Sequence, residues 1–324
     1  MIGTSISPRN ENLWQVIQSY YLLTKPRIIP LLLITTAASM FMAGKGTVDS
    51  PLLIMTLLGG TLAAASAQTF NCVYDQDIDY DMKRTRKRPI PSGKVSSNHA
   101  IIFGIILAIL SFSILAIAVN LLSALLAMSG IVFYMLIYTH WLKRHTSQNI
   151  VIGGAAGAIP PLVGWAAVTG DLNWSAWALF MLIFLWTPPH FWALALMISD
   201  DYAEVGVPML PVVEGTQSTV KQIWIYTLIT VAFSFIFIYP LHSAGFIYFS
   251  IALILGLTFT HKAWQLLQQP ESKDSAKSMF KYSILYLMLL SAGIVLDSLD
   301  WSHQLTDSFD GQIIALLNLW LNFN

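Results

Sequence analysis

The feature that most constrains this chain is a succession of apolar stretches, each close to the length that crosses a lipid bilayer. A spanning helix needs about 20 mostly apolar residues. The stretches lie near residues 28–43, 51–72, 98–119, 122–141, 150–169, 174–197, 222–240, 244–261 and 282–298. Only 10% of the 324 residues are charged and 56% are apolar, whereas soluble domains are about a quarter charged. The sequence therefore predicts an all-α membrane protein with nine transmembrane helices.

No linker or low-complexity tract interrupts this succession of spans. We therefore expect one membrane domain over residues 1–324, with a polar N-terminal segment at 1–24 and an interfacial tail at 299–324. The first dozen residues lack the apolar core and small-residue cleavage site of a signal peptide. The first span is thus expected to direct insertion into the bilayer.

The distribution of Lys and Arg predicts the orientation of the chain. An odd number of spans places the two termini on opposite sides of the membrane. With the N-terminus in the cytoplasm, the basic residues of the loops lie on the cytoplasmic side of the membrane. The single exception is Lys45, which lies on the opposite side. This asymmetry is what the positive-inside rule describes. We expect a multi-pass protein of the plasma (inner) membrane whose long polar segments, 71–97 and 199–221, are cytoplasmic.

The first of these polar segments begins with a regular pattern of oxygen-bearing side chains. Asn71, Asp75 and Asp79 are spaced four residues apart, so a helix places them on one face. Asp77 and Asp81 lie on another face and are weaker candidates. Clustered carboxylates at a membrane helix end repel one another unless a cation neutralises them. Mg²⁺ suits such a site, because it binds few carboxylates together with substrate phosphate oxygens.

A dense basic cluster follows the acidic face. It contains Lys83, Arg84, Arg86, Lys87 and Arg88. Arg and Lys donate hydrogen bonds to phosphate oxygens, Arg in bidentate fashion, so acidic and basic groups together indicate a metal–diphosphate site. The alternative is a headgroup-facing loop with solvated aspartates as counter-charges. The helical spacing of the three oxygen side chains argues against that alternative, since ionisable residues at membrane depth are usually functional.

Several motifs give the chain a specific family resemblance. The pattern Asn71-x3-Asp75-x3-Asp79 resembles the first aspartate-rich motif of the UbiA-type intramembrane prenyltransferases. Further motifs, in order along most of the chain, resemble the haem O synthase branch of that superfamily. They are TKPRI at 24–28, RT at 84–85, RP at 88–89, YTHWLKR at 138–144, IGGAAGAIPPLVGW at 152–165, WTPPHFWALAL at 186–196 and DDYAEVGVPMLPVV at 200–213.

This resemblance implies a fold and a reaction. The fold would be nine helices around a central cavity, with polar cytoplasmic loops holding a diphosphate and Mg²⁺. The reaction would join the farnesyl group of farnesyl diphosphate to a vinyl group of protohaem IX, with addition of water, to give haem O. Haem O is the precursor of haem A, so haem A synthase is an expected partner besides the lipid bilayer.

The resemblance also assigns site residues. Asp75 and Asp79 would be catalytic through the metal, with Asn71 as a further ligand. In the superfamily's second acidic motif, the earlier acid is replaced here by Met197, which leaves Asp201, with Asp200 next, as metal ligands. The diphosphate would be bound by five basic residues, namely Lys83, Arg84, Arg88, Lys143 and Arg144. The last two could instead contact a haem propionate or anchor the helix.

His190 lies within the sixth span, directly after two prolines that disrupt the backbone hydrogen-bond ladder. Two interpretations stay open at the level of sequence. The histidine could be an axial ligand to haem iron, or a cavity residue that hydrogen-bonds a carbonyl freed by the prolines. Either would place it in a haem pocket.

Two other functions compete with haem farnesylation. Another UbiA-type enzyme would prenylate an aromatic quinone precursor or a chlorophyll precursor, but the WTPPHFW and DYAEVGVPMLPVV segments disfavour it. A transporter would need polar residues through the full depth of the spans, whereas these helices are apolar in their outward halves. Nucleic-acid binding is not expected, because the basic cluster is small and interleaved with acids.

Overall fold

The computed structural model describes residues 12–299, and within this range the chain is helical without strands. Eight helices are long and apolar enough to cross a membrane, and a shorter apolar helix precedes them. In chain order these nine are α2 (Ile29–Ala43), α3 (Ser50–Tyr74), α5 (Ser97–Ala118), α6 (Leu121–Val132) continued by η1 (Phe133–Leu142) and α7 (Lys143–His145), α8 (Asn149–Thr169), α9 (Trp174–Met197), α12 (Gly215–Ser234) continued by η2 (Phe235–Phe237), α13 (Phe246–Gln268) and α14 (Lys273–Ser298). The prediction of an all-α protein with nine apolar helices is confirmed.

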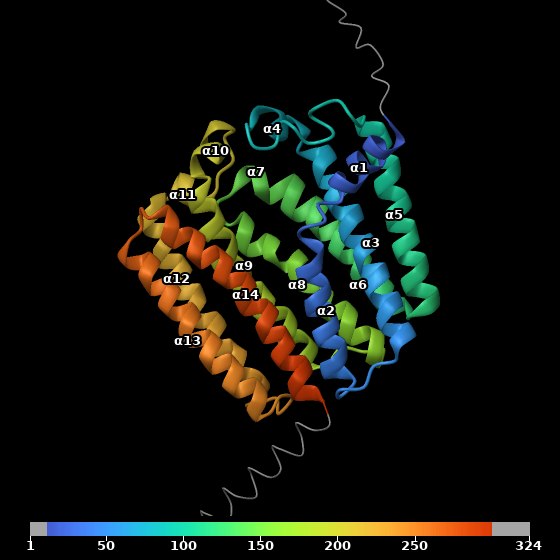
Figure 1. The fold of residues 1–324 in the computed structure, drawn as a ribbon, viewed down its shortest axis with the longest axis vertical. Coiled ribbons are helices and arrows are strands. Elements are labelled where there is room, and N and C mark those ends of the chain that lie inside the picture. The colour runs from blue at the N-terminus through green and yellow to red at the C-terminus, as the bar shows by residue number, and fades with distance from the viewer. Residues whose placement is uncertain (1–11, 300–324) are drawn as a thin grey trace, which may run out of the picture.

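Four short helices complete the described chain. They are α1 (Leu13–Leu23), α4 (Gln76–Asp81), α10 (Ser199–Glu204) and α11 (Leu210–Val213). Figure 1 shows all four at the same end of the bundle, together with α7. Within the segment expected to be polar, 1–24, residues 13–23 thus form a mainly apolar helix. The expected interfacial tail lies outside the described residues, apart from Leu299.

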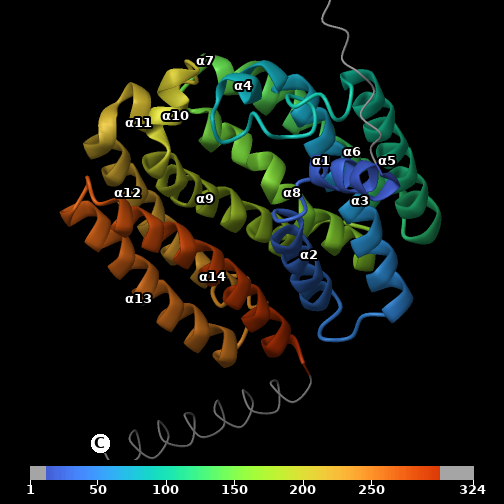
Figure 2. The same cartoon turned by 45° about the horizontal axis from the view of Figure 1, so that its top comes forward.

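The central helices of the bundle are α8 and α9. Two thirds of the spanning part of each is buried, compared with 22–44% in the other long spans. Helix α8 packs between α9, α2 and α6, and α14 packs against both α9 and α2. Figure 2 shows these helices inclined around α8 and α9 below the end that carries α4 and α10. The two most buried spans therefore connect directly to the polar end, since α8 follows α7 and α9 precedes α10.

Close approach between α2 and α8 depends on small residues. A Cβ atom built on Gly164 would lie 2.4 Å from the backbone oxygen of Thr36. This distance is too short for any side chain, so only glycine fits here. One turn earlier, the hydroxyl of Ser39 donates to the carbonyl of Pro161 at 2.6 Å. Glycine lets the backbones meet, as is common in membrane helix packing. The hydroxyl then satisfies a carbonyl in the proline-interrupted helix.

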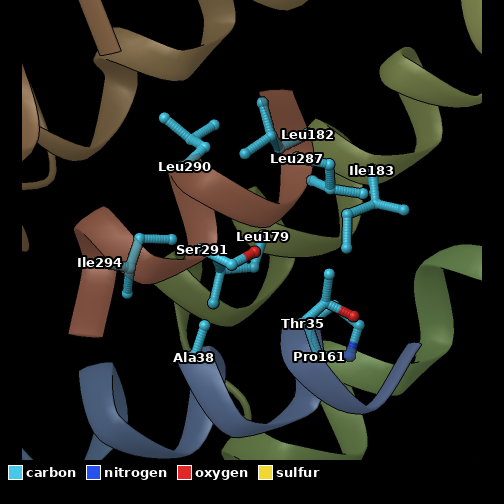
Figure 3. Close-up of a pocket in the computed structure, with 10 residues that line it drawn as sticks. All are labelled: Thr35, Ala38, Pro161, Leu179, Leu182, Ile183, Leu287, Leu290, Ser291 and Ile294. Atoms are coloured by element: carbon cyan, nitrogen blue, oxygen red, sulfur yellow. The ribbon is translucent and has the colours of Figure 1, made fainter. Parts of the chain in front are cut away.

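A narrow apolar pocket lies where α2, α8, α9 and α14 meet (Figure 3). Its free volume is about 10 Å³, so the interior is nearly filled. Aliphatic side chains line most of it, and Thr35 and Ser291 supply the hydroxyl groups. The pocket is the apolar space enclosed by the central helices.

At the opposite end of the bundle, Asp297 of α14 caps the start of α13. Its carboxylate accepts hydrogen bonds from the backbone N–H groups of Gly245, at 2.5 Å, and Tyr248, at 3.0 Å. The first N–H groups of a helix have no partner within the helix, and Gly245 at the N-cap has no side chain to supply one. Asp297 therefore ties α13 to α14.

We expect Asp297→Ala to lower the free energy of unfolding by about 1–3 kcal/mol, because it leaves buried N–H groups unpaired. Thermal unfolding of the purified protein in detergent would measure this loss. Asp49 caps α3 from an exposed position, accepting from Leu52 N–H at 3.3 Å. Asp49→Ala is the matched control and should cost less. An equal effect of the two changes would contradict the role given to Asp297.

Candidate active site

The first acidic motif lies at a break between two helices. Helix α3 ends at Tyr74, and Asp75 has φ −87° and ψ 12° before α4 begins at Gln76. The four-residue hydrogen-bond pattern nevertheless continues, since the N–H of Asp75 donates to Asn71 and that of Asp79 donates to Asp75. As a result, Asn71, Asp75 and Asp79 are all buried. The sequence predicts a continuous helix here. The structure instead has a break at Asp75, but the side chains still recur every four residues on both sides of it.

The remaining acidic residues of this motif face outward. The side chain of Asp77 is 59% exposed, and Asp81 is also exposed. The motif therefore divides into one buried set of oxygen side chains and one solvent-facing set.

Each buried oxygen group is held by a cation from a different part of the chain. Lys143 Nζ lies 2.5 Å from Asp75 Oδ2. Arg88 Nη1 donates to both oxygens of Asp79, at 2.8 and 2.7 Å. Lys25 Nζ donates to Asn71 Oδ1 at 2.5 Å. Charge-assisted hydrogen bonds of this kind are about twice as strong as neutral ones.

Arg88 reaches Asp79 because the intervening loop is folded compactly. The hydroxyl of Thr85, itself buried, donates to the carbonyl of Asp79 at 3.0 Å. The N–H of Arg88 in turn donates to the carbonyl of Thr85 at 2.8 Å. These two bonds turn the chain back on α4. Lys83, by contrast, is exposed on the outside of this loop.

Lys143 and Arg144 directly follow a π-helical segment, η1. The wider turn of a π-helix is rare and often marks a functional site. Within η1, the hydroxyl of Thr139 accepts from Asn71 Nδ2 at 3.2 Å, and the same amide group donates to Asp75 at 2.8 Å. The segment therefore supplies both a polar partner and a cation to the acidic motif.

Lys25 is a site residue that our selection of candidates from the sequence missed. It lies between α1 and α2 with φ 47°, in the left-handed region that non-glycine residues rarely adopt. Burial lowers the pKa of its ammonium group, because desolvation disfavours the charged form. Its signal in the sequence is the TKPRI motif at 24–28, where it directly precedes Pro26.

Arg144 forms a second, more exposed ion pair beside the buried set. Its guanidinium donates to the two oxygens of Asp77 at 2.7 and 2.8 Å and lies 5.0 Å from the ring centre of Tyr74. This hydrogen-bonded partner lowers the pKa of Asp77 to about 2. Arg144 Nη2 also lies 3.8 Å from Asp75 Oδ1. Arg144 therefore links the outer carboxylate to the buried set.

One ion pair joins the second acidic motif to the loop that follows the first, and another joins it to α14. Asp201 lies 3.7 Å from Arg84, and Asp200 lies 3.8 Å from Lys273 at the start of α14. The side chain of Asp200 is 91% exposed and that of Asp201 is 30% exposed. The structure thus brings Asp201, rather than Asp200, toward the first motif. In both motifs a long helix is followed by a six-residue helix bearing carboxylates, α4 or α10.

A polar pocket opens between these two motifs. It has a volume of about 210 Å³. Its walls come from α4, from Arg144 and from the segment that follows α10. The lining residues are Asp77, Ile78, Asp81, Arg144, Val205, Gly206 and Val207. The pocket is therefore next to the buried set, since Arg144, which lines it, also lies 3.8 Å from Asp75.

The buried oxygen groups have the chemistry of a Mg²⁺ site. Asp75 Oδ1 is buried and accepts no hydrogen bond within the described residues, so one carboxylate oxygen is available beside Asp79 and the amide of Asn71. Oxygen donors of this kind suit a hard cation. Among residues 12–299, no three His, Cys, Asp or Glu residues are grouped as metal ligands. In the first motif, only two of the three oxygen side chains are carboxylates.

His190 lies in the middle of the bundle, away from the acidic motif in sequence. It is buried, and its ring stacks on Trp186 at 4.4 Å and on Phe280 at 4.8 Å between ring centres. Its Nδ1 lies 2.7 Å from Ser283 Oγ. The Ser283 hydroxyl donates its own hydrogen to the carbonyl of Phe280, so it accepts from His190.

Because the Ser283 hydroxyl donates to Phe280, this arrangement favours the tautomer of His190 with the proton on Nδ1 and the lone pair on Nε2. The sequence suggested a backbone carbonyl freed by a proline as one partner of His190. The structure does not place that carbonyl at Nδ1. A hydroxyl from α14 takes that place, while Nε2 keeps the form that accepts a hydrogen bond or binds a metal.

A helical bundle with membrane-crossing helices and a buried set of oxygen side chains and cations at one end is the architecture of an intramembrane enzyme. The model of the UbiA prenyltransferase family matches residues 32–285. This match covers more than half of the chain, and the chain belongs to the UbiA prenyltransferase family.

Curated relatives resemble the chain over nearly its whole length. The protein named Protoheme IX farnesyltransferase from Gloeothece citriformis is 68% identical over 319 residues, covering 98% of this chain and 99% of its own. The protein of the same name from Picosynechococcus is 69% identical over 306 residues, covering 94% of this chain and 96% of its own.

Solved structures share the fold at low sequence identity. Digeranylgeranylglyceryl phosphate synthase gives a TM-score of 0.72 at 19% identity, covering 88% of this chain and 99% of its own. A UbiA homologue from Archaeoglobus fulgidus bound to GPP and Mg²⁺ gives 0.60 at 16% identity, covering 86% of this chain and 99% of its own. The expected family and fold are thereby confirmed.

Proposed function

We propose that this protein transfers the farnesyl group of farnesyl diphosphate to a vinyl group of protohaem IX, with addition of water, to give haem O. The observation that carries the proposal is the buried set of Asn71, Asp75 and Asp79 ringed by three cations at the polar end of an apolar bundle. The relatives named Protoheme IX farnesyltransferase support the substrates.

The charges of the buried set match a magnesium diphosphate. Lys25, Arg88 and Lys143 provide three positive charges, and Asp75 and Asp79 provide two negative charges. The set therefore has a surplus of one positive charge, which Mg²⁺ raises to three. A diphosphate ester carries up to about three negative charges near neutral pH. Binding both together neutralises the site, whereas either one alone leaves charge uncompensated in a buried place.

Residues of this chain would divide the work at the diphosphate. Asn71, Asp75 and Asp79 would hold Mg²⁺, with Asp201 as the closest contribution from the second motif. When bound, this ion would neutralise the leaving group as its carbon–oxygen bond breaks. Lys25, Arg88 and Lys143 would donate to the remaining phosphate oxygens. Arg84 and Arg144 lie further out, where they would close the loops over the substrate.

The chemistry balances without an oxidant or reductant. The allylic carbon–oxygen bond breaks and diphosphate leaves with the electron pair. The vinyl carbon forms the new carbon–carbon bond, and water supplies a hydroxyl group while a proton is released. The apolar side chains between α2, α8, α9 and α14 (Figure 3) would have to move apart to admit the prenyl chain, because the free volume there is about 10 Å³.

The test is to incubate the purified protein with protohaem IX, farnesyl diphosphate and Mg²⁺, with and without chelator, and to identify haem products by mass. We expect a chelator-sensitive product heavier by a farnesyl group and water. Absence of a haem product from folded protein would overturn the choice of acceptor. Transfer to an aromatic quinone or chlorophyll precursor in the same assay would then identify the alternative.

We also propose that His190 contacts the haem through Nε2, because Ser283 favours the required tautomer. His190→Leu should weaken protohaem binding by about tenfold or more, the loss of one good polar contact, and shift the haem absorption spectrum. Ser283→Ala should weaken binding less, since it only frees the ring tautomer. Binding titrations by absorbance would measure both. Unchanged binding and spectrum in His190→Leu would remove this residue from the haem pocket.

The polar end of the bundle is proposed to face the cytoplasm from the plasma membrane. This proposal rests on the positive-inside rule and gives haem O a membrane location from which haem A synthase could receive it. Reporters inserted after Lys45 and after Lys94 should appear on opposite sides of the membrane. Finding both on one side would overturn the orientation.

A further inference from the structure

Helix α1 has three faces of different chemistry. The packed face carries Ser19 and Leu23, which are buried, and Val16 and Tyr20, which are partly buried. The polar face carries Gln15 and Gln18, both exposed, with the exposed Leu22 between them. The third face is apolar and exposed, and consists of Leu13, Trp14, Ile17 and Tyr21, with exposures of 73, 70, 49 and 59%. Helical spacing alone separates these faces, since residues 13, 17 and 21 recur every four positions.

Helix α1 is attached to the bundle at its C-terminal end. Leu23 lies in a small core with Cys72, Ile90, Val95 and Ala100. The ring of Tyr20 meets that of Phe103 of α5 edge to face at 5.1 Å. Figure 1 shows α1 beside the start of α5, at the same end as α4. The attachment leaves the apolar face turned away from the protein.

The neighbouring surface identifies what covers this face. Beside Phe103, α5 exposes Ile101, Ile102 and Ile105, and α5 is one of the long apolar helices that cross the membrane. Through the packing of Tyr20 on Phe103, α1 therefore lies beside a helix that crosses the membrane. A helix with an apolar face rich in aromatic residues beside a polar face is typical of an interfacial position in a bilayer. Trp and Tyr favour this depth.

We infer that α1 is a membrane-surface helix, seated at the lipid–water interface through Leu13, Trp14, Ile17 and Tyr21. The same helix ends two residues before Lys25, and the N–H of Lys25 donates to the carbonyl of Leu22 at 3.3 Å. The lipid surface thus fixes the helix from which the chain turns toward Asn71. Contact with lipid and placement of a site cation are coupled through one short connection.

The experiment compares two adjacent positions on different faces. Ile17→Cys and Gln18→Cys, each in the full chain, are labelled with the fluorophore NBD and reconstituted into phosphatidylcholine–phosphatidylglycerol vesicles. Cys72 is buried, so the unsubstituted protein treated in the same way is the blank. We expect the label at 17 to emit at shorter wavelength and to be quenched several-fold more strongly by lipids brominated near the headgroup. The label at 18 should be quenched more strongly by aqueous iodide.

Three outcomes decide the inference. Equal iodide quenching at both positions would overturn it. Protection at 17 without lipid quenching, lost when the protein is diluted in lipid, would identify a second copy as the cover and would also overturn it. Leu13→Cys on the same face should reproduce the result at 17, which separates a true lipid contact from local damage at one site. Unfolding temperatures equal to that of the unsubstituted protein would show that the labelled chains are folded.

Discussion

Asp75→Ala should reduce turnover of farnesyl diphosphate by at least about 10³-fold, equivalent to about 4 kcal/mol of lost transition-state stabilisation. The change removes the carboxylate whose Oδ1 is buried with no hydrogen-bond partner among residues 12–299 and whose Oδ2 binds Lys143. It thereby removes the proposed metal ligand that stands at the centre of the buried set. Steady-state release of diphosphate at saturating Mg²⁺ would measure the loss.

Two further variants make this prediction specific. Asp75→Asn keeps the side-chain volume and limits the structural disturbance that follows when Lys143 loses its buried partner, yet it should also lose most activity. Asp81→Ala removes an exposed carboxylate from the same short helix and should keep activity within about twofold. Wild-type turnover by Asp75→Asn, or equal losses in the Asp75 and Asp81 variants, would refute the assigned metal site.

Lys25→Met should lower kcat/KM for farnesyl diphosphate by about 10²–10³-fold, the effect expected when a buried charge-assisted contact to phosphate is lost. Most of the loss should appear in KM if Lys25 binds the ground state, and in kcat if it stabilises the leaving diphosphate. Arg27→Met is the matched control, because Arg27 lies two residues away and is exposed. A similar loss in both variants would indicate a general charge effect and not a contact.

The thermal stability of Lys25→Met without substrate gives a second, independent test. Burial lowers the pKa of Lys25, so its charged form is less stable in the folded protein than in water. Methionine has similar length and no charge, and its introduction leaves Arg88 and Lys143 still paired with the two carboxylates, Asp79 and Asp75. Lys25→Met should therefore unfold at the same or a higher temperature than the unsubstituted protein while losing activity. A marked loss of thermal stability would give Lys25 a structural role instead.

Features that depend on neighbouring residues, such as hydrophobic length and helical spacing, could be predicted from the sequence. The nine apolar helices follow from local hydrophobicity, because a backbone in lipid must satisfy its hydrogen bonds within the segment. The burial of Asn71, Asp75 and Asp79 follows from their spacing of four, which survived the break at Asp75. In each case the information lies within a few helical turns.

Other features depended on parts of the chain that meet only after folding. Lys143 reaches Asp75 across 68 residues, and Lys25 reaches Asn71 across 46. The partner of His190 comes from α14, 93 residues away. The ranking of Asp201 over Asp200 was already favoured by resemblance, but its ion pair with Arg84 required two loops to be placed side by side.

The sequence by itself determined that this chain crosses a membrane as a helical bundle and that one helix end concentrates oxygen ligands and cations. It did so because hydrophobic length and helical periodicity are properties of contiguous residues. The tertiary structure decided which cation holds which oxygen, which side chain contacts His190 and which face of α1 stays exposed. Those choices depend on helix packing and loop closure, which bring together residues that no local pattern connects.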